Sequence, residues 1–236
     1  MSKMFKGFKE IIKKYYKLAI YFIVFSLLIC IVDQITKWVA YNLLGPLSST
    51  ILPGEELPSQ YGQSVTIIPG LLNFTLLTNN GAAFGMGGNT IGMRVVFIII
   101  SWVVFIFLPL ILLYCLNKYK FVERKKLTFI HIMYFIALIF IYGGNLGNLI
   151  DRTFYWGIPC GVIDFIDISP LIPNFGVFNI ADSFVVIGVL LVVITLIIEM
   201  FKGDDKSKKE LESVKTNVNN DNKNSQENGK ETDSSN

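Results

Sequence analysis

Four long apolar stretches dominate the pattern of hydrophobic and polar positions along this 236-residue chain. Each is long enough to cross a bilayer as a helix, which takes about 20 predominantly apolar residues. We therefore predict four transmembrane helices, approximately over 18–44, 91–116, 127–150 and 178–201. The first stretch is longer than the apolar core of a cleaved signal peptide, and no small-residue cleavage site follows it, so we expect it to be retained.

The connections between the stretches contain strand signals. Within 45–90, two short runs rich in β-forming residues, 64–68 and 71–78, are separated by a Pro-Gly turn. Such runs predict a small antiparallel sheet element, which we place at the outer membrane surface. A further strand over 161–166 is expected in the last connection.

Composition and charge placement narrow the class and the orientation. Hydrophobic residues make up 52% of the chain and charged residues 17%, which argues against a soluble enzyme, a disordered protein or a nucleic-acid binder. Residues 1–17 carry six Lys and 118–126 carry five basic residues, whereas 45–90 has none and 151–177 has only Arg152. By the positive-inside rule both termini are cytoplasmic and the two long connections lie outside.

The same features predict the domain organisation. A basic cytoplasmic N-terminus, 1–17, precedes a four-helix membrane domain, 18–201, with outer loops over 45–90 and 151–177. The remaining stretch, 202–236, is rich in Lys, Glu, Asp, Asn and Ser with almost no apolar residues. Such a segment cannot bury a core, and we expect a disordered cytoplasmic tail.

Acidic residues converge on the outer end of the predicted helices. At 1.5 Å per residue, Asp33 lies about 24 Å from the cytoplasmic flank of the first helix and Asp182 about 30 Å from that of the fourth. Asp164 lies in the adjoining outer connection. Ionisable groups in membrane spans are costly and mark functional sites. Asp164 and Asp182 suggest two carboxylates that share a proton and act as general base and general acid.

A structural role is the alternative interpretation of these acids, which can pair with nearby cations or cap helices. The i, i+4 pair Asp33–Lys37 and the adjacent pair Asp151–Arg152 fit this alternative well. It fits Asp182 less well, because no cation lies near that residue in the sequence. The three Cys lack metal-ligand spacing and the single His lies in an apolar run, so we expect no metal site.

Small and amide residues surround the same zone. Asn79, Asn148 and Asn179 flank it, and their amides can hydrogen-bond a peptide backbone without adding charge. The glycines of 143–148 allow either close helix contact or close approach of a ligand.

Five segments, in order, resemble the motifs of the lipoprotein signal peptidase (signal peptidase II) family. They are DQITK (33–37), NNGAAFG (79–85), GGNLGNLIDR (143–152), VIDFIDI (162–168) and FNIADSFVVIG (178–188). The resemblance implies four transmembrane helices with a small extracytoplasmic antiparallel β-cradle. It also implies an aspartyl endopeptidase without metal or other cofactor, with Asp164 and Asp182 as the catalytic pair. The substrate-contact residues that it implies are Asp33, Lys37, Asn79, Gly81, Asn148, Arg152, Asn179 and Ala181.

The resemblance also implies the reaction. The substrate is a prolipoprotein whose Cys already bears diacylglycerol, and cleavage just before that Cys releases the signal peptide. Membrane lipids and the inhibitor globomycin are further implied partners, and the expected location is the bacterial cell (inner) membrane with the active site at the outer leaflet. Two other functions compete: an ion- or proton-coupled carrier, which needs acids along a path through the bilayer, and a non-catalytic relative that binds lipidated peptides.

Overall fold

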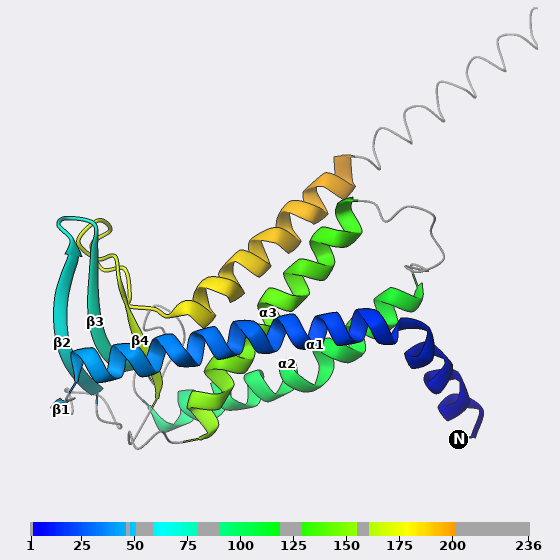
Figure 1. Ribbon diagram of the computed structural model, residues 1–236, viewed down its shortest axis with the longest axis horizontal. Coiled ribbons are helices and arrows are strands. Elements are labelled where there is room, and N and C mark those ends of the chain that lie inside the picture. The colour runs from blue at the N-terminus through cyan, green and yellow to red at the C-terminus, as the bar shows by residue number, and fades with distance from the viewer. Residues whose placement is uncertain are drawn as a thin grey trace, which may run out of the picture. The chain divides into compact units, whose positions relative to one another are not determined.

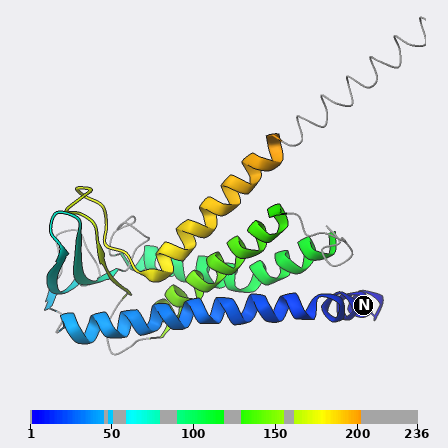
Figure 2. The same ribbon diagram turned by 45° about the horizontal axis from the view of Figure 1, so that its top comes forward.

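The computed structural model describes residues 2–45, 48–50, 59–79, 90–118, 129–154 and 161–201. The chain divides into two compact units, residues 1–192 and 193–236. The first unit contains the three labelled helices and the four strands (Figures 1 and 2). In the second unit, the described residues 193–201 continue a helix that begins at Ile180.

The four predicted transmembrane helices are confirmed among the described residues. They are α1 (Ser2–Leu44), α2 (Ile91–Lys118), α3 (Phe129–Thr153) and a fourth helix (Ile180–Phe201). Each is long and apolar enough to cross a membrane. Most of the large apolar side chains on α2 are exposed, as expected of a surface that faces lipid rather than water. Helix α1 begins well before its apolar stretch, so the basic segment 2–17 is helical too.

A four-stranded antiparallel sheet lies at one end of α1, and its strands run crosswise to that helix (Figure 1). The strands are β1 (Ser48–Thr50), β2 (Ser59–Ile68), β3 (Leu72–Asn79) and β4 (Val162–Asp167), in that spatial order. The predicted hairpin and the predicted third strand are confirmed as β2, β3 and β4. Strand β1 is an addition, because its Ser-Ser-Thr sequence carries no apolar alternation.

Two apolar clusters hold the first unit together. One joins the three labelled helices around Phe22, Leu116, Ile139 and Tyr142. The other packs the end of α1 against the sheet, and its centre is the fully buried Leu76 of β3. Because these clusters fix both α3 and β4 against α1, residues at the ends of all three elements are brought to one place.

Glycines on α3 let its backbone approach two other helices. A Cβ at Gly143 would lie 2.8 Å from the Cβ of Ile29 on α1, and a Cβ at Gly144 would overlap the backbone of Ala181. A Cβ at Gly147 would overlap the carboxylate of Asp33. Of the two interpretations of this glycine run, close helix contact is therefore the one that the fold realises.

Two sequence predictions fall outside the described residues. These are the predicted disordered tail and the substrate-contact residue Gly81.

Candidate active site

The start of the fourth helix is a capping box built from Asn179 and Asp182. The side-chain oxygen of Asn179 accepts a hydrogen bond from the backbone N–H of Asp182 (2.8 Å), and Oδ2 of Asp182 accepts one from the backbone N–H of Asn179 (3.4 Å). This reciprocal pair is the usual way to satisfy the free N–H groups of a helix start. The geometry therefore gives Asp182 the helix-capping role of the structural alternative, and it also fixes where the carboxylate lies.

Strand β4 carries Asp164 into the same place. On one side β4 pairs with β3, with Asp164 opposite Leu77; on the other, Ile166 forms a bridge with Phe178, just before the fourth helix. The segment Val162–Phe165 is buried at every position, as for a strand covered on both faces. Asp164 itself is only 1% exposed.

Asparagine amides hold the two carboxylates together. Oδ1 of Asp164 accepts a hydrogen bond from Nδ2 of Asn179 (2.6 Å), and its Oδ2 accepts one from Nδ2 of Asn79 (3.0 Å). Oδ1 of Asp182 accepts one from Nδ2 of Asn148 (2.8 Å). Asn179 also donates to Oδ1 of Asn148 (3.1 Å), which closes a chain of amides between the two acids. The site thus contains two neighbouring carboxylates surrounded by neutral donors.

The environment of Asp164 favours its protonated form. Burial raises the pKa of Asp164 well above its ordinary value, and the neighbouring charge of Asp182 raises it further. Hydrogen bonds from Asn79 and Asn179 and the charge of Lys37 lower the pKa, but they offset only part of this shift. A carboxyl that resists ionisation beside a second carboxylate is the arrangement that can supply an acid and a base at one site.

Asp167, three residues further along β4, is in a different situation. Partial burial raises its pKa, but hydrogen bonds from Ser169, Thr75 and Asn73 outweigh that effect and lower the pKa overall. Its carboxylate accepts the backbone N–H of Ser169 (2.9 Å) and the hydroxyl of Thr75 (2.9 Å). Asp167 therefore braces the turn that follows β4.

A second group of acids surrounds the ammonium of Lys37, which is 1% exposed. Nζ of Lys37 lies 2.7 Å from Asp33 and 2.8 Å from Asp151, and it donates to Oδ1 of Asn148 (3.0 Å). These three acceptors match the three N–H donors of an ammonium. The predicted Asp33–Lys37 pair is confirmed as an ion pair, and Asp151 pairs with Lys37 of α1 rather than with Arg152.

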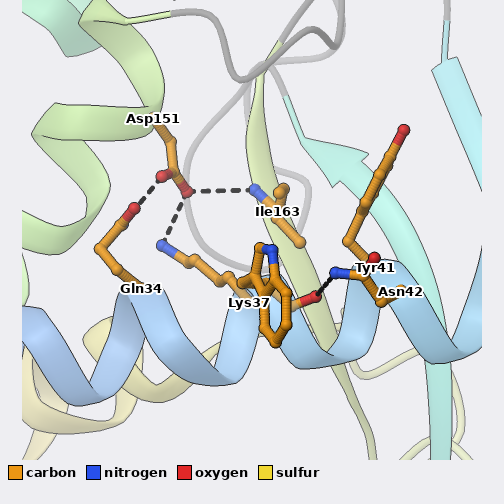
Figure 3. Close-up of a pocket in the computed structure, with 7 residues that line it drawn as sticks. Gln34, Lys37, Tyr41, Asn42, Asp151 and Ile163 are labelled. Atoms are coloured by element: carbon orange, nitrogen blue, oxygen red, sulfur yellow. Dashed lines mark hydrogen bonds and ion pairs between the residues drawn. The ribbon is translucent and has the colours of Figure 1, made fainter.

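The Lys37 group also braces the site. Oδ1 of Asp33 accepts the backbone N–H of Ala181 in the first turn of the fourth helix (2.8 Å). Asp151 accepts the backbone N–H of Ile163, the residue before Asp164 (3.3 Å; Figure 3). The fully buried Ala181 has a Cβ small enough to let α3 approach closely. Through Asp33 and Asp151, the Lys37 group therefore connects α1 to the fourth helix, which carries Asp182, and to β4, which carries Asp164.

Arg152 lies at the end of α3, on the side that faces α2. Its Nη1 donates to the hydroxyl of Ser101 (3.2 Å), and the guanidinium lies over the ring of Phe97, 5.8 Å from its centroid. The charges of Asp182 and Asp164 also act on Arg152.

Nine of the ten candidate site residues lie in described segments, and the structure brings them to one end of the helices. Asp164 and Asp182 are joined through Asn148 and Asn179, with Asn79 on Asp164. Lys37, Asp33 and Ala181 form the adjoining group. Gly81 lies outside the described residues.

Sequence reasoning missed the side chain of Gln34 and misassigned Asp151. Nε2 of Gln34 donates to Asp151 (2.9 Å) and to the carbonyl of Gly147 (3.0 Å), which joins α1 to α3. Both residues line a recess of about 270 Å³ beside Lys37 (Figure 3). A signal for Asp151 was present, because Asn148 and Asp151 are three residues apart and so share a helix face.

Together, four helices long enough to span a membrane, a small antiparallel sheet, and the buried carboxylate of Asp164 beside the half-buried one of Asp182 define a multi-pass membrane protein with two acids joined through amides. The family model for signal peptidase (SPase) II matches residues 25–198. The chain is 35% identical over 175 residues to a lipoprotein signal peptidase of Coxiella burnetii (strain RSA 493 / Nine Mile phase I), which covers 74% of this chain and 88% of the relative.

A lipoprotein signal peptidase of Staphylococcus aureus is 32% identical over 193 residues, covering 80% of this chain and 98% of the relative. A solved bacterial membrane enzyme, determined by the in meso method at 2.3 Å resolution, superposes with a TM-score of 0.54 at 29% identity, covering 76% of this chain and 89% of the other. The chain therefore belongs to the signal peptidase II family, and it is a membrane protease.

Proposed function

We propose that this chain removes the signal peptide from prolipoproteins whose Cys already carries diacylglycerol, with Asp164 and Asp182 as the catalytic pair. The observation that carries the proposal is the chain of amides that holds these two carboxylates side by side. Amides position a carboxylate without neutralising it, so the pair keeps a proton that can move. Membership of the family supplies the reaction class.

In this proposal one acid of the pair acts as base and the other as acid. The ionised carboxylate takes a proton from a water molecule, and the resulting hydroxide attacks the carbonyl carbon of the residue before the lipidated Cys. The protonated carboxyl gives its proton to the carbonyl oxygen, which completes a tetrahedral diol intermediate. When this intermediate collapses, the carboxyl that took a proton from water gives it to the leaving amine of the Cys, and a hydroxyl of the intermediate returns a proton to the other carboxylate. The proposal assigns the base and acid roles to Asp164 and Asp182 together, as a pair.

The location of the pair suits such a substrate. Asp182 lies at the start of the fourth helix and Asp164 on the adjoining sheet, so the pair lies where a lipidated Cys at the membrane surface would be presented. The lipid-facing side chains of the spans contact membrane lipids. By the distribution of Lys and Arg, we place both termini in the cytoplasm and the sheet at the outer face of the bacterial cell membrane.

The test is a gel-shift cleavage assay with the full chain in detergent or nanodiscs. The substrates are one prolipoprotein with and without its diacylglyceryl group, and globomycin serves as a competitor in a further reaction. The proposal expects cleavage of the lipidated form, inhibition by globomycin, and a loss of at least about a thousandfold in Asp164→Asn and Asp182→Asn. Equal cleavage of both substrates would overturn the substrate assignment, and full activity in either Asn variant would overturn the catalytic pair.

A further inference from the structure

A single hydroxyl side chain interrupts the apolar middle of α2. In the stretch 95–113 the polar side chains are Ser101 and the indole of Trp102. The neighbours of Ser101 face outward, since Ile100 is 49% exposed and Val103 is 47% exposed, whereas Ser101 is 3% exposed. A buried hydroxyl in a membrane helix needs a partner, so its contacts show what it does.

Ser101 receives two hydrogen bonds from α3. Its Oγ accepts one from Nη1 of Arg152 (3.2 Å), and its backbone carbonyl accepts one from Nδ2 of Asn145 (3.0 Å). Asn145 and Arg152 are seven residues apart, which is two helical turns, so both project from the same face of α3. Phe97, one turn before Ser101, supplies the ring under the guanidinium of Arg152. Helix α2 therefore holds Arg152 from two adjacent turns.

The guanidinium is thereby held near the acid pair but not against it. The charges of Asp182 and Asp164 act on Arg152, yet within the described residues its hydrogen bond goes to Ser101. This spacing matters because a guanidinium bonded directly to a carboxylate favours the ionised form and removes the proton that the pair must share. At a slightly greater distance the same cation still stabilises negative charge that develops during the reaction.

We propose that Ser101 is a positioning residue that holds Arg152 away from Asp164 and Asp182 and directs its charge at the reacting groups. This inference deepens the proposed function and rests on it. It predicts that loss of the Ser101 hydroxyl frees the guanidinium to approach the acid pair. The pair then ionises more easily, and the alkaline limb of the pH–rate profile moves to lower pH.

The experiment compares Ser101→Ala with Ser101→Thr, which keeps the hydroxyl, in the cleavage assay with lipidated prolipoprotein. We expect Ser101→Ala to lower kcat about tenfold with little change in KM and to shift the alkaline limb of the pH–rate profile to lower pH. We expect Ser101→Thr to recover most of the wild-type rate. Val103→Ala, on the lipid-facing side of the same helix, is the matched control and should match the wild type. Melting temperatures are recorded for every variant; should Ser101→Ala not fold, Ser101→Cys, of similar volume but with a poor acceptor, carries the same readouts.

A double-mutant cycle shows whether Ser101 acts through Arg152. In an Arg152→Met background the proposal expects Ser101→Ala to have little further effect, because the cation that Ser101 positions is gone. Additive losses, an unmoved pH limb or a wild-type rate in Ser101→Ala would overturn the inference. Failure of the proposed function is distinguishable, because it would appear as an inactive wild type or an active Asp164→Asn.

Discussion

Two groups of carboxylates lie side by side at one end of the helices, and they differ in what surrounds them. Asp33 and Asp151 share the ammonium of Lys37, whose three donors are all used. Asp164 and Asp182 share hydrogen bonds from asparagines instead. The first group has a cation bonded to both of its carboxylates. The second has a carboxyl whose pKa is raised, namely Asp164, because burial opposes its ionisation.

The difference separates a structural group from a chemical one. The Lys37–Asp151 ion pair joins α1 to α3, and the hydrogen bond from the Ala181 N–H to Asp33 joins α1 to the first turn of the fourth helix, so these contacts fix the three helices against one another. Amide donors hold the other two acids in place without removing their capacity to exchange a proton. Acids at the same end of the helices can therefore have either role, and the neighbouring donor, which is a cation in one group and an amide in the other, decides which.

The largest expected effect comes from removing the shared cation. Lys37→Met leaves Asp33 and Asp151 buried without their partner, and breaking a buried ion pair in this way costs about 3–5 kcal/mol. Unfolding of the purified protein in detergent measures the loss. Lys17→Met, an exposed position on the same helix, is the control and should leave the unfolding free energy unchanged. Equal unfolding free energies for the two variants would show that the Lys37 group does not stabilise the fold.

A methyl group added at Gly147 of α3 tests the contact between α3 and Asp33 of α1. The added Cβ of Gly147→Ala would overlap the carboxylate of Asp33 and lie 3.1 Å from the Cβ of Ala181, so overpacking should cost about 1–3 kcal/mol. Gly92→Ala on α2 is the matched control, because its added Cβ would meet no atom within 4 Å. Thermal unfolding of both variants makes the measurement. A Gly147→Ala protein as stable as Gly92→Ala would contradict the close approach of α3.

Asn79→Ala sharpens the account of the acid pair. Nδ2 of Asn79 donates to Oδ2 of Asp164, and this bond lowers the pKa of Asp164. Its loss should raise that pKa further, so the alkaline limb of the kcat/KM profile moves to higher pH, with a rate loss of about tenfold. The shift is opposite in sign to that expected for Ser101→Ala. A limb that moves to lower pH would contradict the role of Asn79.

The pH dependence of stability should reflect Asp164 as well. Because the folded-state pKa is raised, the folded protein holds this proton more tightly than the unfolded chain does. Stability therefore falls as the pH rises from the ordinary pKa of Asp through the raised one. Unfolding measured across that range should show the decrease in the wild type and a smaller one in Asp164→Asn. Identical slopes would contradict a raised pKa.

The smallest effect on stability and cleavage rate is expected at Asp167, which accepts hydrogen bonds in the turn after β4. Its lowered pKa means that its contribution to stability is present above the ordinary pKa of Asp and is lost as the pH falls through the lowered one. The side-chain oxygen of Asn can still accept from Ser169, so Asp167→Asn should cost under about 1 kcal/mol and change the cleavage rate less than about threefold. A loss as large as that of Asp164→Asn would place Asp167 in the catalytic pair.

Local sequence patterns predicted the membrane spans and the hairpin well. A long apolar run is sufficient to predict a spanning helix, and two β-rich runs beside a turn are sufficient to predict a hairpin. The start of α1 was missed, since apolar residues mark only the part of a helix that meets lipid, and Ser2–Lys17 is basic. Strand β1 was missed because three polar residues carry no alternation.

Partners of buried charges were harder to predict than their positions. Asp151 is adjacent to Arg152 in sequence, but neighbouring residues on a helix point about 100° apart, so the two side chains face different helices. Asp151 meets Lys37 of α1, and Arg152 meets Ser101 of α2. Such contacts depend on which helix packs on which face, and a single sequence does not carry that information.

The comparison between the two acid groups is tested most directly by four Asn variants measured side by side. The variants are Asp164→Asn, Asp182→Asn, Asp33→Asn and Asp151→Asn, each assayed for melting temperature and for cleavage of lipidated prolipoprotein. We expect the first two to melt at or near the wild-type temperature with cleavage abolished, and the last two to melt lower because Lys37 loses a partner. Cleavage by Asp164→Asn or Asp182→Asn, or a drop in their melting temperature as large as that of Asp33→Asn, would contradict the account.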